Sequence, residues 1–192
     1  MIAILNYGAG NTKSVQFALN RLGFDSVLTN DAEEIRRADK VIFPGVGEAS
    51  SAMSELKKYG LEKLIPELKQ PVLGICLGMQ LMCESSEEGN TDCVGIFPIK
   101  VKRFETALKV PQMGWNTISN LKSDLFKNIT EDEYTYFVHS FYVPKNEYTI
   151  AEAEYELVFA AAIQKDNFYA TQFHPEKSSG IGEQILKNFI NL

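Results

Sequence analysis

One stretch decides the fold: Pro71-Val72-Leu73-Gly74-Ile75-Cys76-Leu77-Gly78-Met79-Gln80-Leu81. It begins as a short apolar run after a proline, which predicts a buried strand. From Leu77 onward the apolar residues have helical spacing, and we expect that helix to reach Ser85. Between strand and helix, Cys76 has a glycine two positions away on each side. Such a G-x-C-x-G turn is the cysteine form of the nucleophile elbow, whose small neighbours allow a sharp turn.

The elbow predicts that Cys76 lies at the carboxyl edge of a sheet and at the N-terminus of a helix. The partial positive charge of that terminus lowers the pKa of a thiol and favours the thiolate. A free cysteine is more often a small buried apolar residue, and that alternative applies here. The paired glycines and the change from strand to helix favour a nucleophile.

Strands and helices alternate through the first half of the chain. Besides the elbow, we expect strands at 1–5, 26–28 and 41–43 and helices at 14–22, 32–37, 49–59 and 61–68. This alternation is typical of a parallel, doubly wound α/β sheet. Ligands bind such sheets at the carboxyl ends of the strands. Residues 6–11, 44–47 and Cys76 should all lie at that edge.

The second half has a different pattern, with short aromatic or β-branched segments. They predict strands at 99–104, 134–138, 150–155, 159–164 and 169–173, followed by a helix at 181–190. Asp166-Asn167 favours a hairpin turn between the last two strands. With no linker or repeat in the sequence, we expect one domain over residues 1–192 with an antiparallel elaboration.

Composition excludes several classes of function. A formal net charge of -6 without a long basic run argues against nucleic-acid binding. The three cysteines, Cys76, Cys83 and Cys93, have no C-x-x-C spacing, which argues against a zinc site. We expect no metal and no cofactor. The apolar opening Met1–Leu5 is too short for a signal peptide or membrane span, so a cytoplasmic protein is expected.

A nucleophilic Cys76 needs a base, and the sequence offers two histidines. His174 follows a predicted strand, and Glu176 is placed two residues later to bond the second imidazole nitrogen. The alternative for His174 is a turn histidine with a solvated neighbour. His139 is the rival base, but no acid stands beside it, and we interpret its segment as a wall of the site.

A second glycine turn favours an oxyanion hole. In Pro44-Gly45-Val46-Gly47, the glycines at a strand end let backbone N–H groups turn toward the cysteine. The amide of Leu77, directly after the nucleophile, is the other candidate donor. Alone, P-G-x-G is more simply an ordinary strand-end turn.

Taken together, these motifs resemble the class I (triad) glutamine amidotransferases. The resemblance rests on residues 44–47, 74–80 and 172–176, in that order along the chain, and runs essentially end to end. Two further stretches, Asn6-Tyr7-Gly8-Ala9-Gly10-Asn11 and Pro111-Gln112-Met113-Gly114-Trp115-Asn116, are similar to those of glutaminase subunits that serve bacterial imidazole glycerol phosphate synthases.

The resemblance implies the role of each residue in glutamine hydrolysis. Cys76 would attack the carboxamide of L-glutamine, His174 would transfer protons, and Glu176 would orient His174. The Gly47 and Leu77 amides would stabilise the oxyanion, with Gly47 brought into place by a peptide flip that a partner triggers. The implied substrate-binding residues are Gly45, Val46, Gln80, Glu84, His139, Ser140 and Phe141; Glu84 could equally be a solvated helix residue.

The resemblance also implies a partner. The glutaminase body takes up the whole sequence, so the ammonia-using synthase is expected on another chain. That chain would be a (β/α)8-barrel cyclase subunit, forming a heterodimer that channels ammonia and converts phosphoribulosyl-formimino carboxamide nucleotide (PRFAR) to imidazole glycerol phosphate and AICAR. The expected interface comprises Asn6, Tyr7, Asn11, Pro111, Gln112, Met113, Trp115, Asn116 and Lys177. A sole tryptophan is more often buried, which is the alternative for Trp115.

Two alternatives remain open at the level of the sequence. The chain could be the glutaminase of a different synthase, one that aminates sugars or another heterocycle. It could instead be a non-catalytic sensor on the same scaffold, with Cys76 as an oxidisable thiol. That second alternative assigns no role to His174 and Glu176.

Overall fold

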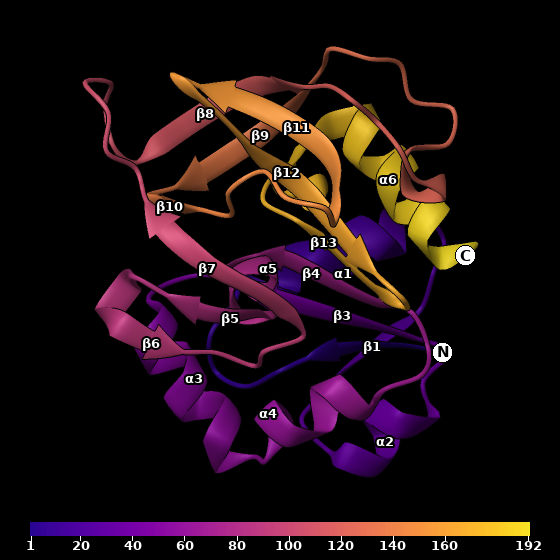
Figure 1. Ribbon diagram of the computed structural model, residues 1–192. Coiled ribbons are helices and arrows are strands. Elements are labelled where there is room, and N and C mark those ends of the chain that lie inside the picture. Colours follow the sequence, from indigo (N-terminus) through magenta and orange to yellow (C-terminus); the bar gives the residue numbers. More distant parts are fainter.

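A seven-stranded sheet forms the centre of the computed structural model, which describes residues 1–192 (Figure 1). Its strands are β1 (Ile2–Leu5), β2 (Ser26–Thr29), β3 (Lys40–Gly45), β4 (Val72–Cys76), β11 (Thr149–Tyr155), β12 (Leu157–Lys165) and β13 (Phe168–Thr171). Their order is β11-β12-β13-β4-β3-β1-β2. The strands from β13 to β2 run parallel, whereas β11 and β12 pair antiparallel. The predicted α/β, mostly parallel sheet is confirmed.

Helices cover both faces of this sheet (Figure 1). One face carries α2 (Ala32–Arg37), α3 (Ala49–Lys58) and α4 (Leu61–Leu64), and the other carries α1 (Thr12–Arg21) and α6 (Ser179–Ile190). Successive strand residues point to opposite faces. In β1, Ala3 and Leu5 therefore join the core under α3, while Ile2 and Ile4 join the core under α6. Burial on both faces explains why β1 reads as a continuous apolar run.

The elbow helix is shorter than predicted. α5 (Leu77–Leu81) ends before Cys83–Ser86, which form the strand β5. The prediction of a helix to Ser85 was wrong, because β5 pairs with two other strands, β6 (Thr91–Asp92) and β7 (Phe97–Arg103). Serine side chains also compete with helical backbone bonds, which favours this early end.

Two small sheets lie beside the central sheet, and β5 and β7 pair parallel in the first of them. β5, β6 and β7 join β10 (Phe141–Tyr142) in one, and β8 (Gln112–Ile118) pairs with β9 (Glu133–His139) in the other. We call the second sheet the β8–β9 ribbon. The sequence analysis missed β8, because Pro111 and Gly114 are turn signals. Its residues alternate between faces, and pairing with β9 supplies their hydrogen bonds.

β13 joins the two halves of the fold. It pairs antiparallel with β12 through the predicted Asp166-Asn167 turn, in which Asp166 has φ +52°. On its other edge it pairs parallel with β4. The end of β13 is thereby brought beside the end of β4, where Cys76 lies. None of the helices has both the length and the apolar character needed to cross a membrane.

Candidate active site

The elbow holds Cys76 in a backbone conformation that L residues rarely adopt, with φ +55° and ψ -109°. Gly78 permits this turn, since a β-carbon there would lie 1.9 Å from the carbonyl oxygen of Phe43 in β3. Gly74 is similarly restricted, because its β-carbon would lie 3.0 Å from the amide nitrogen of Met79. The paired glycines are therefore required by close packing between α5, β4 and β3. Backbone strain of this kind gathers at functional sites.

His174 and Glu176 lie together in the turn after β13. Nδ1 of His174 is 2.8 Å from Oε1 of Glu176, and both side chains are almost fully buried. The turn is fastened to β9, since the His174 amide donates to the Tyr136 carbonyl. The hydroxyl of Ser178 donates to the carbonyl of His174 itself. These bonds fix the imidazole before any substrate binds.

The imidazole of His174 is coupled to Cys76. Burial alone would lower the pKa of His174, but the charge of the Cys76 thiolate and hydrogen bonding with Cys76 and Glu176 outweigh burial and raise it to about 10. Nε2 is buried and makes no hydrogen bond of ordinary geometry. The nearby sulfur and the Glu176 carboxylate both favour the protonated form of the imidazole.

Two further groups contact the sulfur of Cys76. Its Sγ lies 3.7 Å from the carbonyl oxygen of Val138 in β9 and 3.8 Å from Nε2 of Gln172. Tyr7 also lies near the sulfur. Its burial, and after it the charge of Cys76, raise the pKa of its phenol. The sequence analysis assigned no site role to Gln172, although it stands two residues before His174.

The glycine turn after β3 is partly exposed. Gly45 is packed tightly, and a β-carbon on it would lie 2.8 Å from the amide nitrogen of Gly78. Gly47 has φ +100° and no neighbouring atom that would touch a β-carbon, and Val46 is exposed. The first part of this turn is therefore held against the elbow helix, while its second part has room to reorient.

His139 is held neutral in an aromatic environment. Its ring packs against Phe104, Phe137 and Phe159. Burial, together with the charge of His174, lowers the pKa of His139 to about 4, despite its bond of 2.7 Å to the Phe141 carbonyl. A base with so low a pKa does not activate a thiol at neutral pH, so this geometry favours His174.

Gln80 and Glu84, the two expected glutamine-binding side chains, lie in different surroundings. Gln80 is buried in α5, and its Nε2 donates to the Phe141 carbonyl at 2.9 Å and to Oε1 of Gln172 at 3.0 Å. Glu84 is exposed on β5. The expectation that a helix carries Glu84 was wrong, because α5 ends at Leu81.

The expected interface residues divide into exposed and buried sets. Met113 and Trp115 are 64% and 53% exposed on one face of the β8–β9 ribbon, so Trp115 is not a core residue. Lys177 lies over the ring of Tyr136 on the opposing strand. Gln112 and Tyr7 are buried in the isolated chain, and the Tyr7 hydroxyl donates to the Pro44 carbonyl. The exposed members of the expected interface are therefore Asn6, Met113, Trp115 and Lys177.

Asn6, Asn11, Pro111 and Asn116 are at least partly exposed. Asn11 caps α1 by accepting from the Ser14 amide, and Asn116 donates to the Glu154 carbonyl. Ser140 and Phe141 also retain partial exposure beside the buried His139. The core of the protein therefore does not enclose these positions.

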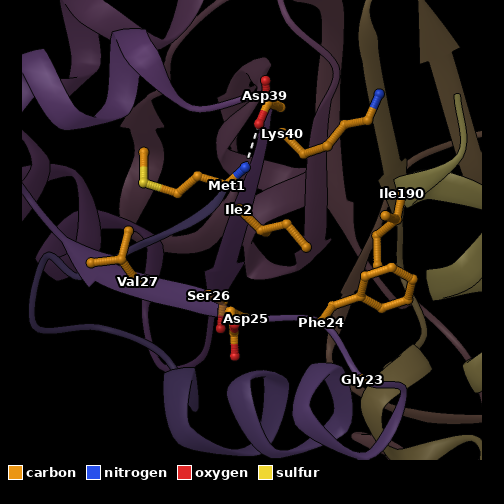
Figure 2. A pocket seen from close by; sticks show the side chains of 10 residues that line it. All are labelled: Met1, Ile2, Gly23, Phe24, Asp25, Ser26, Val27, Asp39, Lys40 and Ile190. Carbon is orange, nitrogen blue, oxygen red and sulfur yellow. Dashed lines mark hydrogen bonds and ion pairs between the residues drawn. The ribbon is translucent and has the colours of Figure 1, made fainter.

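The largest hollow in the molecule lies away from this chemistry. Its volume is about 670 Å³, and Figure 2 shows its lining at the amino ends of β1 and β3, where the Met1 ammonium pairs with Asp39. Phe24 and Ile190 form part of its apolar wall. It is at the opposite end of the strands from Cys76, so the geometry of the side chains identifies the site, and cavity size does not.

Comparisons with known proteins agree with this geometry. The family model described as "Glutamine amidotransferase class-I" matches residues 3–192. "Imidazole glycerol phosphate synthase subunit HisH" of Bacteroides fragilis (strain YCH46) is 62% identical, covering 100% of this chain and 99% of the relative. The protein of that name from Idiomarina loihiensis is 48% identical, covering 100% and 97%. The structure of PurLQS from Thermotoga maritima shares the fold, with a TM-score of 0.74, 16% identity and coverage of 99% and 97%.

Proposed function

Because the chain belongs to the class I glutamine amidotransferase family, we propose that it hydrolyses L-glutamine as the glutaminase subunit of an imidazole glycerol phosphate synthase. The observation that carries the proposal is the buried arrangement of Cys76, His174 and Glu176 at a strained elbow. The similarity to HisH subunits, such as the relative that is 62% identical over the whole chain, supports the place in histidine biosynthesis.

The first half of the reaction forms a thioester. The Cys76 thiolate attacks the side-chain carboxamide carbon of glutamine, and a carbon–sulfur bond forms. The carbon–nitrogen bond then breaks as the His174 imidazolium gives its Nε2 proton to the departing nitrogen, which leaves as ammonia. Glu176 keeps Nδ1 protonated and the ring in place, because its carboxylate accepts from that nitrogen.

The second half restores the nucleophile. Neutral His174 takes a proton from water, the hydroxide attacks the thioester carbon, and the carbon–sulfur bond breaks. Glutamate leaves, and the thiolate is again paired with an imidazolium. In both halves negative charge develops on the carboxamide oxygen, which the amides of Leu77 and Gly47 would bind after the exposed turn reorients.

The substrate would lie between α5 and the segment His139-Ser140-Phe141, beside Gly45 and Val46. Both amide hydrogens of Gln80 are already donated within the protein, so only its carbonyl oxygen is free to accept from glutamine. His139 contributes by holding the Phe141 carbonyl. Glu84 is exposed on β5, and its carboxylate reaches the substrate only if glutamine extends to that strand.

The partner would be the (β/α)8-barrel cyclase subunit, bound over the carboxyl edge of the sheet. Met113, Trp115 and Lys177 supply exposed side chains there, next to Asn6, Asn11, Pro111 and Asn116. Met113 pairs with Val138, whose carbonyl contacts the Cys76 sulfur. One strand pair thus connects the proposed interface to the nucleophile. We place the reaction in the cytoplasm, since Cys76 must stay reduced to act.

The test is glutamate release from glutamine, measured with the chain alone, with a cyclase subunit, and with that subunit and PRFAR. Strong activation by subunit and nucleotide together is the expected result, and Cys76→Ala should abolish it. Activity indifferent to both additions would assign the glutaminase to another synthase. Unchanged activity in Cys76→Ala would overturn the mechanism.

A further inference from the structure

We propose that Gln172 is a positioning residue that stabilises the Cys76 thiolate by donating an amide hydrogen to its sulfur. The inference rests on the proposed role of Cys76 as nucleophile. Gln172 is fully buried directly after β13, and its Nε2 lies 3.8 Å from Sγ. Buried amides are nearly always hydrogen-bonded, and the sulfur is the acceptor that this nitrogen reaches.

The orientation of the Gln172 amide is set by its neighbours. Its Oε1 accepts from Nε2 of Gln80 at 3.0 Å, so its own nitrogen must face the sulfur. Gln80 in turn donates to the Phe141 carbonyl, which also accepts from Nδ1 of His139. Because that acceptor is a carbonyl, His139 must carry its hydrogen on Nδ1. A buried chain of bonds thus runs from His139 to the nucleophile.

A hydrogen-bond donor at this position would offset the effect of a carbonyl group that also contacts the sulfur. The Val138 carbonyl, 3.7 Å away, presents the negative end of its dipole and disfavours a thiolate. The side-chain amide of Gln172, which follows β13, directs the positive end of its dipole at the same sulfur. The titratable groups around the sulfur are His174 and Tyr7, with Glu176 and His139 behind His174. None of these four residues is altered in the Gln172 variants.

Two substitutions separate donation from packing. Gln172→Glu keeps the shape and an oxygen that accepts from Gln80, but directs a carboxylate oxygen at the sulfur. Gln172→Met keeps the approximate volume without donor or charge. Gln164→Glu is the matched control for added charge, since Gln164 lies at the end of β12 and bonds Ser123.

The readout is the pH dependence of Cys76 alkylation by iodoacetamide, followed by mass spectrometry of the Cys76 peptide. In this reaction the thiolate sulfur bonds the methylene carbon and iodide leaves. It requires neither turnover nor a partner, so it tests Gln172 independently of the proposed function. Midpoints give the thiolate titration whatever the accessibility of the sulfur.

We expect the alkylation midpoint to rise by about one pH unit in Gln172→Met, which is a tenfold smaller thiolate fraction at pH values well below the midpoint, and to rise further in Gln172→Glu. Gln164→Glu should match the wild-type midpoint. A wild-type midpoint in folded Gln172→Glu would overturn the proposal, even if glutamine hydrolysis by Cys76 were established. If Gln172→Met does not fold, Gln172→Glu alone decides.

Discussion

Gly182 of α6 touches the histidine turn so closely that a β-carbon on it would lie 1.9 Å from the carbonyl oxygen of Pro175. Pro175 stands between His174 and Glu176. The C-terminal helix is therefore docked directly on the backbone that carries the proposed base and its orienting acid. Ser178 adds to this docking, because its hydroxyl donates to the His174 carbonyl and its own carbonyl accepts from the Gly182 amide.

Gly182→Ala should therefore impair both stability and catalysis. Forcing a methyl group into this contact should lower the free energy of unfolding by about 1–3 kcal/mol and displace His174 from Cys76. Gly180→Ala, in the same helix, is the control: no atom lies within 4 Å of its β-carbon. It should be neutral or stabilising by up to about 1 kcal/mol. Urea unfolding and glutaminase assays compare them, and equal behaviour would contradict the docking.

Because the backbone at Cys76 is strained, we expect glycine to give a more stable protein than alanine there, the reverse of the order at an ordinary buried site. Glycine tolerates φ +55° and ψ -109°, whereas alanine does not. Cys76→Gly should be more stable than Cys76→Ala by about 1–3 kcal/mol. At Cys83 on β5, which is also buried, alanine should be the more stable by about 0.5–1 kcal/mol. Thermal or urea unfolding of all four variants measures the two orders, and the same order at both sites would argue against strain.

His174 and Glu176 should differ in how much their loss costs. His174→Ala removes the proton carrier and should reduce kcat by about 10²–10⁴. Glu176→Gln should cost much less, since it leaves the proton carrier in place. Kinetics at one pH compares them, and equal losses would mean that the two roles are wrongly assigned.

Glu176→Gln should also change the pH profile. Activity needs protonated His174 and is lost as pH rises through its pKa of about 10. Removing the Glu176 charge lowers that pKa, so the alkaline limb of kcat/KM should move to lower pH. A substrate-saturated sample at each pH serves as the control for unfolding. If the alkaline limb stays at the wild-type pH, a group other than His174 must cause it.

His139 should make the fold less stable in acid. Its pKa of about 4 lies below the ordinary value of 6.5, so the unfolded chain binds the proton more tightly. Stability contributed by neutral His139 is full above pH 6.5 and is lost as pH falls toward 4, by about 3 kcal/mol. His139→Asn keeps a donor near Nδ1 and should lack this loss. The free energy of unfolding of both proteins is measured from pH 7 to 4. If it falls equally in both, neutral His139 does not cause the loss of stability.

Trp115 should be an anchor for the partner. Trp115→Ala should weaken binding of the cyclase subunit by about 2 kcal/mol, or roughly thirtyfold, as for a central aromatic contact. Tyr59→Ala at the C-terminal end of α3 is the control, since Tyr59 is comparably exposed but far along the chain from the ribbon. Calorimetric titration measures both. Equal affinities would remove Trp115 from the interface.

The features that the sequence predicted well are local. The elbow is formed by residues 74–78, and His174 and Glu176 are only two positions apart. Each motif can therefore be recognised within a few consecutive residues. The alternating elements of the first half follow for the same reason. The end of the elbow helix was wrong, because pairing of Cys83–Ser86 with β7 overrode the helical spacing, and the expected helix at 61–68 is α-helical only over Leu61–Leu64.

The features that the sequence did not predict depend on distant pairing. β8 contains turn signals and becomes a strand only beside β9. Tyr7 stands in a glycine-rich turn, yet its ring packs on Phe43 and is buried. Gln172 acquires its role from Gln80, which is 92 positions away in the sequence. No local pattern distinguishes these residues from ordinary turn or strand residues.

The pairing of Met113 with Val138 has a consequence for how the two proposed activities depend on each other. If a protein bound at Met113 shifts Val138 so that the thiolate becomes more favourable, thermodynamic linkage requires the converse. Formation of the thiolate, or occupation of the site by glutamine, must then tighten that protein's binding by the same factor. The affinity for a protein bound at the β8–β9 ribbon would therefore depend on the state of Cys76 to the same extent as the state of Cys76 depends on that protein.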